Sequence, residues 1–247
     1  MSKVTHCSKN KGILRFFIFA ILSLALTLTL AFLFLPRGKE EGKEKGSIAA
    51  KDFVLYLDAG HGGFDTGAVA TLGDGKTLAE KDLVLALALD AASELRALGY
   101  TVHLSRKDDR RHTYTTSADE VYARRADAAA RGTTLLLSIH ANAYAGEGRA
   151  FGARVYYHPS YTDGARIATL FADAITRETA ALSGRNARAI ADGSYAILGD
   201  KSVPALLFEC GFLSDPAECA LLADEGYRAH LVRGVVAGIE AIRLSSK

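Results

Sequence analysis

Short runs of consecutive apolar residues alternate with longer helical patterns between residues 52 and 247, and this alternation constrains the fold more than any other feature. Continuously apolar runs are typical of strands that are buried on both faces of a sheet. The longer segments carry leucine and alanine at helical spacing, and glycines such as Gly99 and Gly132 end them. The sequence therefore predicts an α/β fold, a three-layer α/β/α sandwich around a mostly parallel, mixed central sheet of about six strands.

The individual elements follow from the same patterns. We expect strands over residues 53–57, 100–104, 134–139, 153–157, 195–198 and 205–208. We expect helices over residues 80–98, 121–131, 163–182 and 225–243. Residues 52–247 have the size of an ordinary single domain and show no internal repeat or second linker, so we expect one domain there.

The first 51 residues differ in character from the rest. Residues 1–15 are basic, residues 16–35 carry no charge, and residues 36–51 mix both charges with glycine. A helix over the uncharged stretch would be about 30 Å long, which matches the thickness of a bilayer core. Because basic residues stay in the cytoplasm, we expect a single-pass transmembrane signal anchor, a flexible charged linker, and an extracytoplasmic domain at the cell membrane. The alternative is a cleaved signal peptide and a secreted domain, although such peptides have shorter apolar regions of about 7–15 residues.

Charge and cysteine content narrow the choice of partners. The formal net charge is only +2, and no basic stripe is interleaved with aromatic side chains, so we do not expect a nucleic-acid partner. Three cysteines do not make a disulfide framework. Cys210 and Cys219 could pair outside the membrane, and otherwise Cys210 packs behind a strand.

Three titratable residues stand where apolar runs end. His61, His140 and Glu209 each follow a predicted strand. Because the ligand crevice of an open α/β sheet lies outside the carboxyl ends of its strands, these side chains can converge on one site. Two imidazoles and a carboxylate suit a zinc hydrolase that has one further ligand.

The first of these histidines lies in a glycine-rich turn, residues 57–68 (LDAGHGGFDTGA). The glycines allow a sharp turn and leave space beside the imidazole of His61. A phosphate-binding loop is excluded because neither G-x-x-x-x-G-K-[ST] nor a clean G-x-G-x-x-G is present.

This turn resembles the signature of the zinc-dependent N-acetylmuramoyl-L-alanine amidases, the amidase-3 type of cell-wall hydrolase. In that family a D-x-G-H-G-G-x-D-x-G-A pattern carries a zinc-binding histidine, which corresponds to His61. The family also has a glutamate ligand in an E-K-x-x-x-L context, and residues 80–85 match this context with Glu80.

Two downstream motifs extend the resemblance. Residues 138–142 match an S-I-H-x-N pattern whose histidine, here His140, is the third zinc ligand of the family. Residues 209–214 match an E-x-G-F-[IL]-[ST] pattern that carries the catalytic glutamate, here Glu209. A short, anchored member of this type also resembles the spore-cortex, germination-related amidases.

The resemblance implies a complete hydrolytic site. Zn²⁺ would have His61, Glu80 and His140 as ligands and one open position, and Glu209 would act as general base and then general acid. The implied reaction is hydrolysis of the amide between N-acetylmuramic acid and L-alanine of the stem peptide, so peptidoglycan is the expected substrate. Whether a protein activator is needed does not follow from the sequence.

Weaker positions surround this site. We expect Asp58 to orient a ligand or cap a turn. We expect Asn142 to help to hold the metal ligands in place without binding the metal itself. Arg188 falls where the family has an arginine. We assign these three residues substrate or supporting roles.

Other interpretations use the same residues. A zinc peptidase or deacetylase would apply the same metal chemistry to another carbonyl, and a peptidoglycan-binding module would have lost catalysis. Taken alone, Glu80 could complement a helix dipole and His140 could be a satisfied core histidine. A general base beside an open metal site would have no purpose in a pure binder, which favours the enzyme.

Overall fold

The structure is a computed structural model that describes residues 49–109, 117–146, 150–199 and 202–246. The expected signal anchor at 16–35 and most of the expected linker lie outside the described residues. None of the helices in the described residues is both long and apolar enough to cross a membrane.

The centre of the fold is a mixed sheet with the strand order β4-β1-β5-β8-β6-β7. Its strands in chain order are β1 (Val54–Ala59), β4 (Thr101–Leu104), β5 (Leu135–Asn142), β6 (Arg154–Tyr157), β7 (Arg188–Ala191) and β8 (Ala205–Phe212). All neighbouring strands are parallel except β6 and β8, which are antiparallel. A separate antiparallel hairpin consists of β2 (Val69–Thr71) and β3 (Thr77–Ala79).

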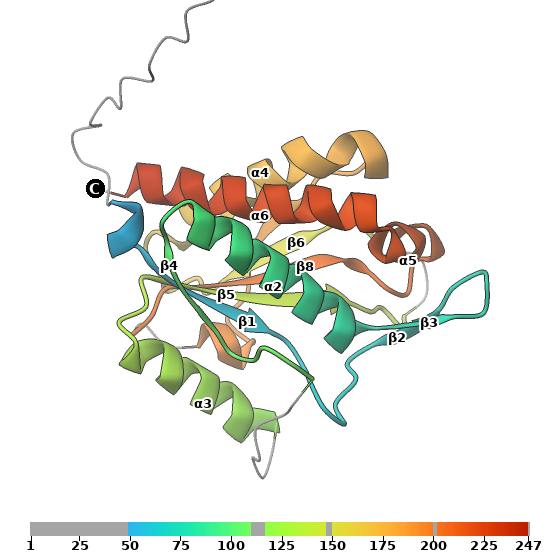
Figure 1. Cartoon of the computed structure of the whole chain (residues 1–247), viewed down its shortest axis with the longest axis horizontal. Helices are drawn as coiled ribbons and strands as arrows, with labels where there is room; N and C mark the ends of the chain where they lie inside the picture. The colour runs from blue at the N-terminus through green and yellow to red at the C-terminus, as the bar shows by residue number, and fades with distance from the viewer. Residues whose placement is uncertain (1–48, 110–116, 147–149, 200–201, 247) are drawn as a thin grey trace, which may run out of the picture. The chain divides into compact units, whose positions relative to one another are not determined.

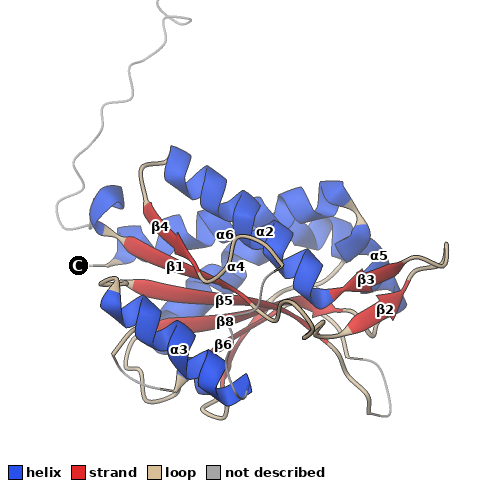
Figure 2. Ribbon diagram, turned by 60° about the horizontal axis from the view of Figure 1, so that its bottom comes forward, coloured by secondary structure: helices blue, strands red, loops and turns tan. Residues whose placement is uncertain are grey.

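Helices cover both faces of the sheet, as Figures 1 and 2 show. On one face lie α2 (Glu80–Ala97), α4 (Gly164–Ser183) and α6 (Glu225–Ser245), with α5 (Pro216–Ala223) against α6. On the other face lie α3 (Ser117–Ala130) and the short 3₁₀ helix η2 (Ala196–Leu198), while a further 3₁₀ turn, η1 (Ala50–Asp52), precedes β1. This arrangement confirms the predicted three-layer sandwich.

Alternation along each strand divides the core into two layers. Leu57, Leu137 and Phe208 belong to the larger buried cluster, which includes residues of α2, α4 and α6. Tyr56 and Leu136 belong to the smaller cluster, which includes residues of α3 and η2. Successive strand residues point to opposite faces, so both faces of these strands are buried, as their continuously apolar sequences indicated.

Local sequence explains where helices begin and end. Asp215 accepts hydrogen bonds from the backbone N–H groups of Ala217 and Glu218, and Pro216 occupies the first position of α5. Gly184 ends α4 in the left-handed conformation, with φ 67°.

One predicted element needs correction, and several were missed. The predicted strand at 195–198 is wrong: residues Ala196–Leu198 form η2, in which Ile197 and Leu198 are buried against the sheet face and the Arg125 guanidinium donates to the Ile197 carbonyl. The strand β7, the β2–β3 hairpin and the helix α5 were not predicted. The edge strand β7 is partly exposed and has a mixed sequence, so it lacks an apolar run.

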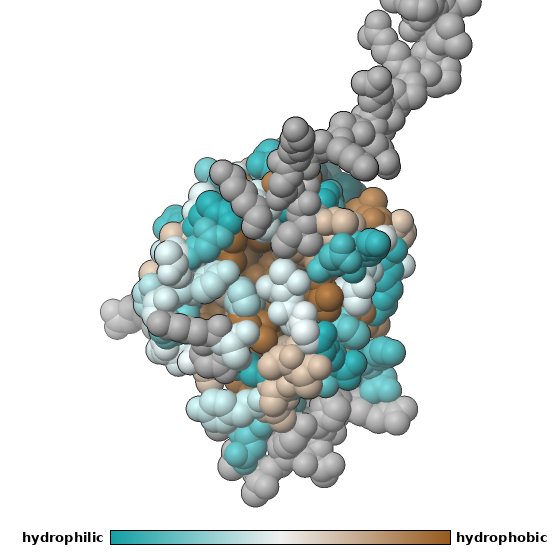
Figure 3. Space-filling model, turned by 90° about the vertical axis from the view of Figure 1, so that its left-hand side faces the viewer, coloured by the Kyte–Doolittle hydropathy of each residue, from teal (hydrophilic) through white to brown (hydrophobic). Residues whose placement is uncertain are grey.

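The cysteine alternatives are also decided. Cys210 and Cys219 are both buried and free, so the pairing does not form, and Cys210, a residue of β8, packs in the larger core cluster. On the face seen in Figure 3, which looks from the side where β1 begins, hydrophilic residues form most of the rim and apolar residues show in its centre.

Candidate metal centre and active site

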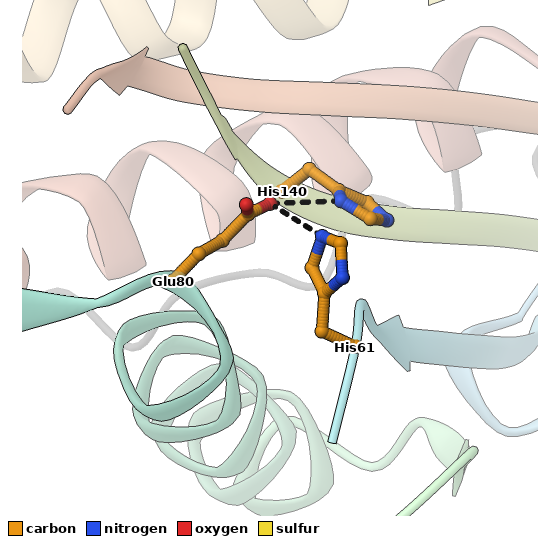
Figure 4. Close-up of side chains that lie close together, drawn as sticks. All are labelled: His61, Glu80 and His140. Carbon is orange, nitrogen blue, oxygen red and sulfur yellow. Dashed lines mark hydrogen bonds and ion pairs between the residues drawn. The ribbon is translucent and has the colours of Figure 1, made fainter. Parts of the chain in front are cut away.

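Three side chains from distant parts of the chain converge at the end of β1 (Figure 4). One ligand atom from each of His61, Glu80 and His140 lies within 4.8 Å of the others. The Glu80 Oε1 atom is 3.1 Å from His61 Nε2 and 2.9 Å from His140 Nδ1. The two imidazole rings are 4.9 Å apart at an interplanar angle of 76°. The structure therefore brings together the three residues that the sequence predicted as ligands.

Two glycines create the space for this cluster. A Cβ atom on Gly60 would lie 2.3 Å from His140 Cε1, so no larger residue fits beside that ring. Gly67 has a φ of +62°, and a Cβ there would lie 2.5 Å from Glu80 Oε2 and 2.6 Å from His61 Cδ2. His61 itself has a φ of 60° and is the one non-glycine residue with positive φ in the described part of the chain. The glycine-rich motif is thus a packing requirement of the site.

Glu80 is the first residue of α2 and is held by backbone groups on both sides. Its carboxylate accepts hydrogen bonds from the N–H of Ala68 at 2.9 Å and of Ala141 at 3.0 Å. Burial opposes its ionisation, but hydrogen bonds and charge from His140 and His61 hold the pKa of Glu80 well below its ordinary value. The carboxylate is therefore charged at neutral pH, as a metal ligand must be.

Glu209 lies beside the cluster on the neighbouring strand. The register of β5 and β8 pairs His140 with Glu209, so both residues lie within strands and not after them as the sequence analysis expected. The Glu209 residue is 8% exposed, and within the described residues its buried Oε2 atom has no hydrogen-bond partner. Burial raises the pKa of Glu209 to about 7, against the lowering effect of His140. Such a carboxyl can both accept and donate a proton near neutral pH.

Asp58 supports the cluster from within the core and does not join it. Its carboxylate accepts hydrogen bonds from Ser138 Oγ at 2.7 Å and from Arg124 Nη1 at 3.2 Å. Arg124 also pairs with Glu120 and lies 3.4 Å from the His61 carbonyl oxygen. Burial disfavours the charged form, but Arg124 and Ser138 hold the pKa of Asp58 below its ordinary value. The predicted orienting role of Asp58 agrees with these contacts.

Arg124 and Glu120 were not predicted from the sequence as parts of this site, and Arg106 matched a family pattern only as a position without a role. The Arg106 guanidinium donates hydrogen bonds to the carbonyls of Ala59, Gly60 and Lys81 at 3.1, 2.9 and 2.7 Å. It thereby ties the turn before His61 to the residue after Glu80. A buried arginine inside an amphipathic helix or after a short strand looks like a surface residue in sequence, so only the fold identifies these roles.

The other two candidate residues lie further away. Asn142 ends β5, where its carbonyl accepts a hydrogen bond from Leu213 N at 2.8 Å. Within the described residues, its side chain makes no hydrogen bond to the cluster. Arg188 begins β7, two strands from Glu209, and is exposed.

A cavity of about 230 Å³ opens over the cluster. Its lining includes His61, His140, Glu209, Asp58 and Tyr195. The cavity thus brings together the two histidines of the cluster, the protonatable carboxyl and an aromatic side chain at one end of the sheet.

A three-layer α/β fold with a His–Glu–His cluster and an adjacent glutamate defines the class of protein, an α/β domain able to hold a metal ion at the carboxyl edge of its sheet. The family described as N-acetylmuramoyl-L-alanine amidase (Amidase_3) matches residues 55–241, and the chain belongs to this family. The predicted family is therefore confirmed.

Individual relatives agree with this membership. A probable cell wall amidase, LytH of Staphylococcus aureus, is 33% identical over 198 residues, which cover 80% of this chain and 60% of that protein. The crystal structure of N-acetylmuramoyl-L-alanine amidase from Clostridium difficile 630 is 28% identical with a TM-score of 0.68, covering 79% of this chain and 98% of that one. The CwlD amidase from Clostridioides difficile, solved in complex with the GerS lipoprotein, is 29% identical with a TM-score of 0.64, covering 76% and 96%.

Proposed function

We propose that the protein is a zinc-dependent amidase that hydrolyses the bond between N-acetylmuramic acid and the L-alanine of the peptidoglycan stem peptide. The observation that carries this proposal is the pairing of Glu209 with His140 on neighbouring strands, which places a buried, protonatable carboxyl beside three metal-binding side chains. Family membership supports the substrate.

The donor set fits zinc. Two imidazoles and one carboxylate, without a thiolate, leave one coordination position for water or substrate, as in catalytic zinc sites. Glu80 is charged and anchored by two N–H groups, so its oxygen is fixed before any metal arrives. A bound zinc ion would polarise the scissile carbonyl and lower the pKa of a water molecule.

The residues of the chain supply the remaining steps. Glu209 accepts a proton from the attacking water at its unpartnered Oε2 atom and then passes a proton to the leaving amine nitrogen. Asp58, through Arg124, and Arg106, through the Gly60 carbonyl, keep the His61 turn in place.

The location and partners of the protein are further parts of the proposal. The uncharged stretch at 16–35 and the basic residues before it support a single-pass anchor with the catalytic domain outside the cytoplasm. The relative solved with the GerS lipoprotein supports a protein partner for this amidase as well. Fractionation of cells, followed by protease treatment of intact spheroplasts, tests the location: we expect a membrane-bound, protease-accessible domain, whereas a protected domain would overturn the orientation.

The activity is tested with the detergent-solubilised full-length chain, loaded with zinc, and its Glu209→Gln variant. Each is incubated with purified peptidoglycan, and released peptides are identified by mass spectrometry. We expect stem peptides with a free L-alanine N-terminus from the parent, and a loss of rate of about 10²–10⁴-fold in the variant. Cleavage within the stem peptide would instead identify a peptidase, and released acetate would identify a deacetylase.

A further inference from the structure

The catalytic row of the sheet continues beyond Glu209 into two arginines. The strand register pairs His140 with Glu209, Glu209 with Arg154, and Arg154 with Arg188. Side chains of directly paired residues point to the same face of a sheet. The four residues therefore form one line across β5, β8, β6 and β7, on the face where Glu209 lines the active-site cavity.

The two arginines differ in how firmly they are held. The Arg154 guanidinium lies 4.6 Å over the ring of Phe212, and its Nη1 donates to the Tyr156 hydroxyl at 3.3 Å. Arg188 lies on the edge strand and is exposed, and its guanidinium makes no hydrogen bond or ion pair with any described residue. The row thus ends in one oriented cation and one cation that is available to a ligand.

Arg188 also lines a second cavity, of about 300 Å³. Arg185 lines it as well, with its guanidinium 4.1 Å from the Phe151 ring and 3.8 Å from Glu218 Oε1. Of the charged side chains lining this cavity, Arg185 is engaged by a carboxylate and Arg188 is not. An acidic group of a ligand is the natural partner for Arg188.

The direction of the substrate follows from the role of Glu209, and this step rests on the proposed function. A general acid must reach the leaving nitrogen, so the leaving group lies on the Glu209 side of the metal ligands. Beyond Glu209 the row leads to Arg154 and Arg188. The leaving group is the stem peptide, which carries free carboxylates, whereas the lactyl-glycan part loses its carboxylate charge in the amide. Charge complementarity therefore agrees with the direction given by the row.

The spacing also agrees. Neighbouring strands lie about 4.8 Å apart, so a point between Arg154 and Arg188 lies roughly 7 Å along the sheet from Glu209. Two extended residues span about 7 Å. The second residue of the stem peptide, a γ-linked glutamate with a free α-carboxylate, would present its charge at that point.

We propose that Arg154 and Arg188 form a carboxylate subsite that binds the free α-carboxylate of the second stem-peptide residue. Arg154 supplies the oriented part of the subsite and Arg188 closes it from the edge strand. The subsite would distinguish stem peptides that have a free carboxylate from those in which this group is amidated.

The test compares two synthetic substrates, muramoyl-L-alanyl-D-isoglutamate and its amidated counterpart with D-isoglutamine. The zinc-loaded full-length chain and its Arg188→Gln, Arg188→Lys and Arg154→Gln variants are assayed with both, and Arg177→Gln on the exposed side of α4 is the matched control. We expect Arg188→Gln to lower kcat/KM for the acid roughly tenfold through KM, and to leave the amide unchanged. Arg188→Lys should restore part of the loss.

Each other outcome has a defined meaning. If Arg188→Gln changes both substrates equally, or neither, the subsite is overturned while the amidase activity stands. Cleavage of neither substrate by the parent overturns the proposed function, and the subsite is then judged by calorimetry. In that measurement L-alanyl-D-isoglutamate must bind the parent roughly tenfold more tightly than Arg188→Gln, and equal affinities reject the subsite.

Discussion

At the scale of single residues, the site depends on buried charged groups that have hydrogen-bond or ion-pair partners. Asp58 is fully buried between Ser138 and Arg124, and its pKa is held below the ordinary value. A carboxyl whose pKa is depressed in the folded state contributes stability above its unfolded pKa of about 3.9, and this contribution is lost as the pH falls below that value. If this carboxylate is removed, its partner Arg124 keeps the Glu120 carboxylate and the His61 carbonyl oxygen.

We therefore expect Asp58→Asn to lower the free energy of unfolding by about 3 kcal/mol at pH 7. We also expect the difference between parent and variant to shrink as the pH falls below about 4. Denaturant unfolding between pH 3 and pH 7, with a chelator present throughout, measures both effects. A difference that stays constant over this range would show that the charge of Asp58 does not contribute to stability.

The identity of the site residues could be read from the sequence because their surroundings are local. Two positions of the motif have no room for a larger residue, because Gly60 faces the His140 ring and Gly67 faces Glu80. The role of Arg106 could not be read in the same way, because three of its four carbonyl partners come from two distant segments. Nor could Arg154, whose importance depends on a strand register that no local pattern encodes.

At the scale of elements, the glycine-rich turn after β1 is shaped around a ring on β5. We expect Gly60→Ala to weaken zinc binding at least tenfold, because the added methyl would lie 2.3 Å from His140 Cε1 and displace that ring. Gly73→Ala is the matched control, since nothing lies within 4 Å of its Cβ position. Competition with a fluorescent zinc chelator measures the affinities, and equal affinities in the two variants would contradict this account of the turn.

A second element-scale feature is the link that Arg106 makes between the turn after β1 and the start of α2. We expect Arg106→Ala to destabilise the fold by about 3 kcal/mol, because three carbonyls lose their charged donor. Thermal unfolding of the metal-free protein measures the change, with Arg177→Ala as a control on the surface of α4. A melting temperature equal to that of the control would mean that water replaces the guanidinium at no cost.

The elements themselves were predicted unevenly for physical reasons. Strands such as β1 and β5 are buried on both faces, so each begins with an unbroken apolar run, at residues 54–57 and 135–137. The residues of η2 are equally apolar, but they form a single helical turn that is buried against the sheet face. A run of four apolar residues does not distinguish such a turn from a strand. The edge strand β7 begins with an exposed arginine, and its two central residues are only partly buried. It therefore contains no apolar run that would predict a strand.

At the scale of the whole molecule, metal binding and stability are linked. A ligand that binds only the folded state stabilises it, by about 2.7 kcal/mol at a concentration 100 times its Kd. We expect zinc to raise the melting temperature of the parent and of Glu209→Gln alike, because Glu209 lies outside the His61–Glu80–His140 cluster. His140→Ala should lose this increase. Differential scanning calorimetry with and without zinc measures the effect, and a Glu209→Gln variant that no longer responds would place that residue among the ligands.

The reversal of β6 has a consequence for how such a domain can diversify. In a purely parallel sheet, all strands finish at the same end of the sheet. The chain segments at that end are therefore all segments that leave strands. Here β6 is antiparallel to β8, and β7 is parallel to β6. Both strands therefore begin at the end of the sheet where β1, β5 and β8 finish. Segments that enter strands and segments that leave them therefore lie at the same end of the sheet. Changes in length before β6 or β7 can reshape the cavity beside Arg188, which these segments line, while the His61–Glu80–His140 cluster, built by other connections, keeps its geometry.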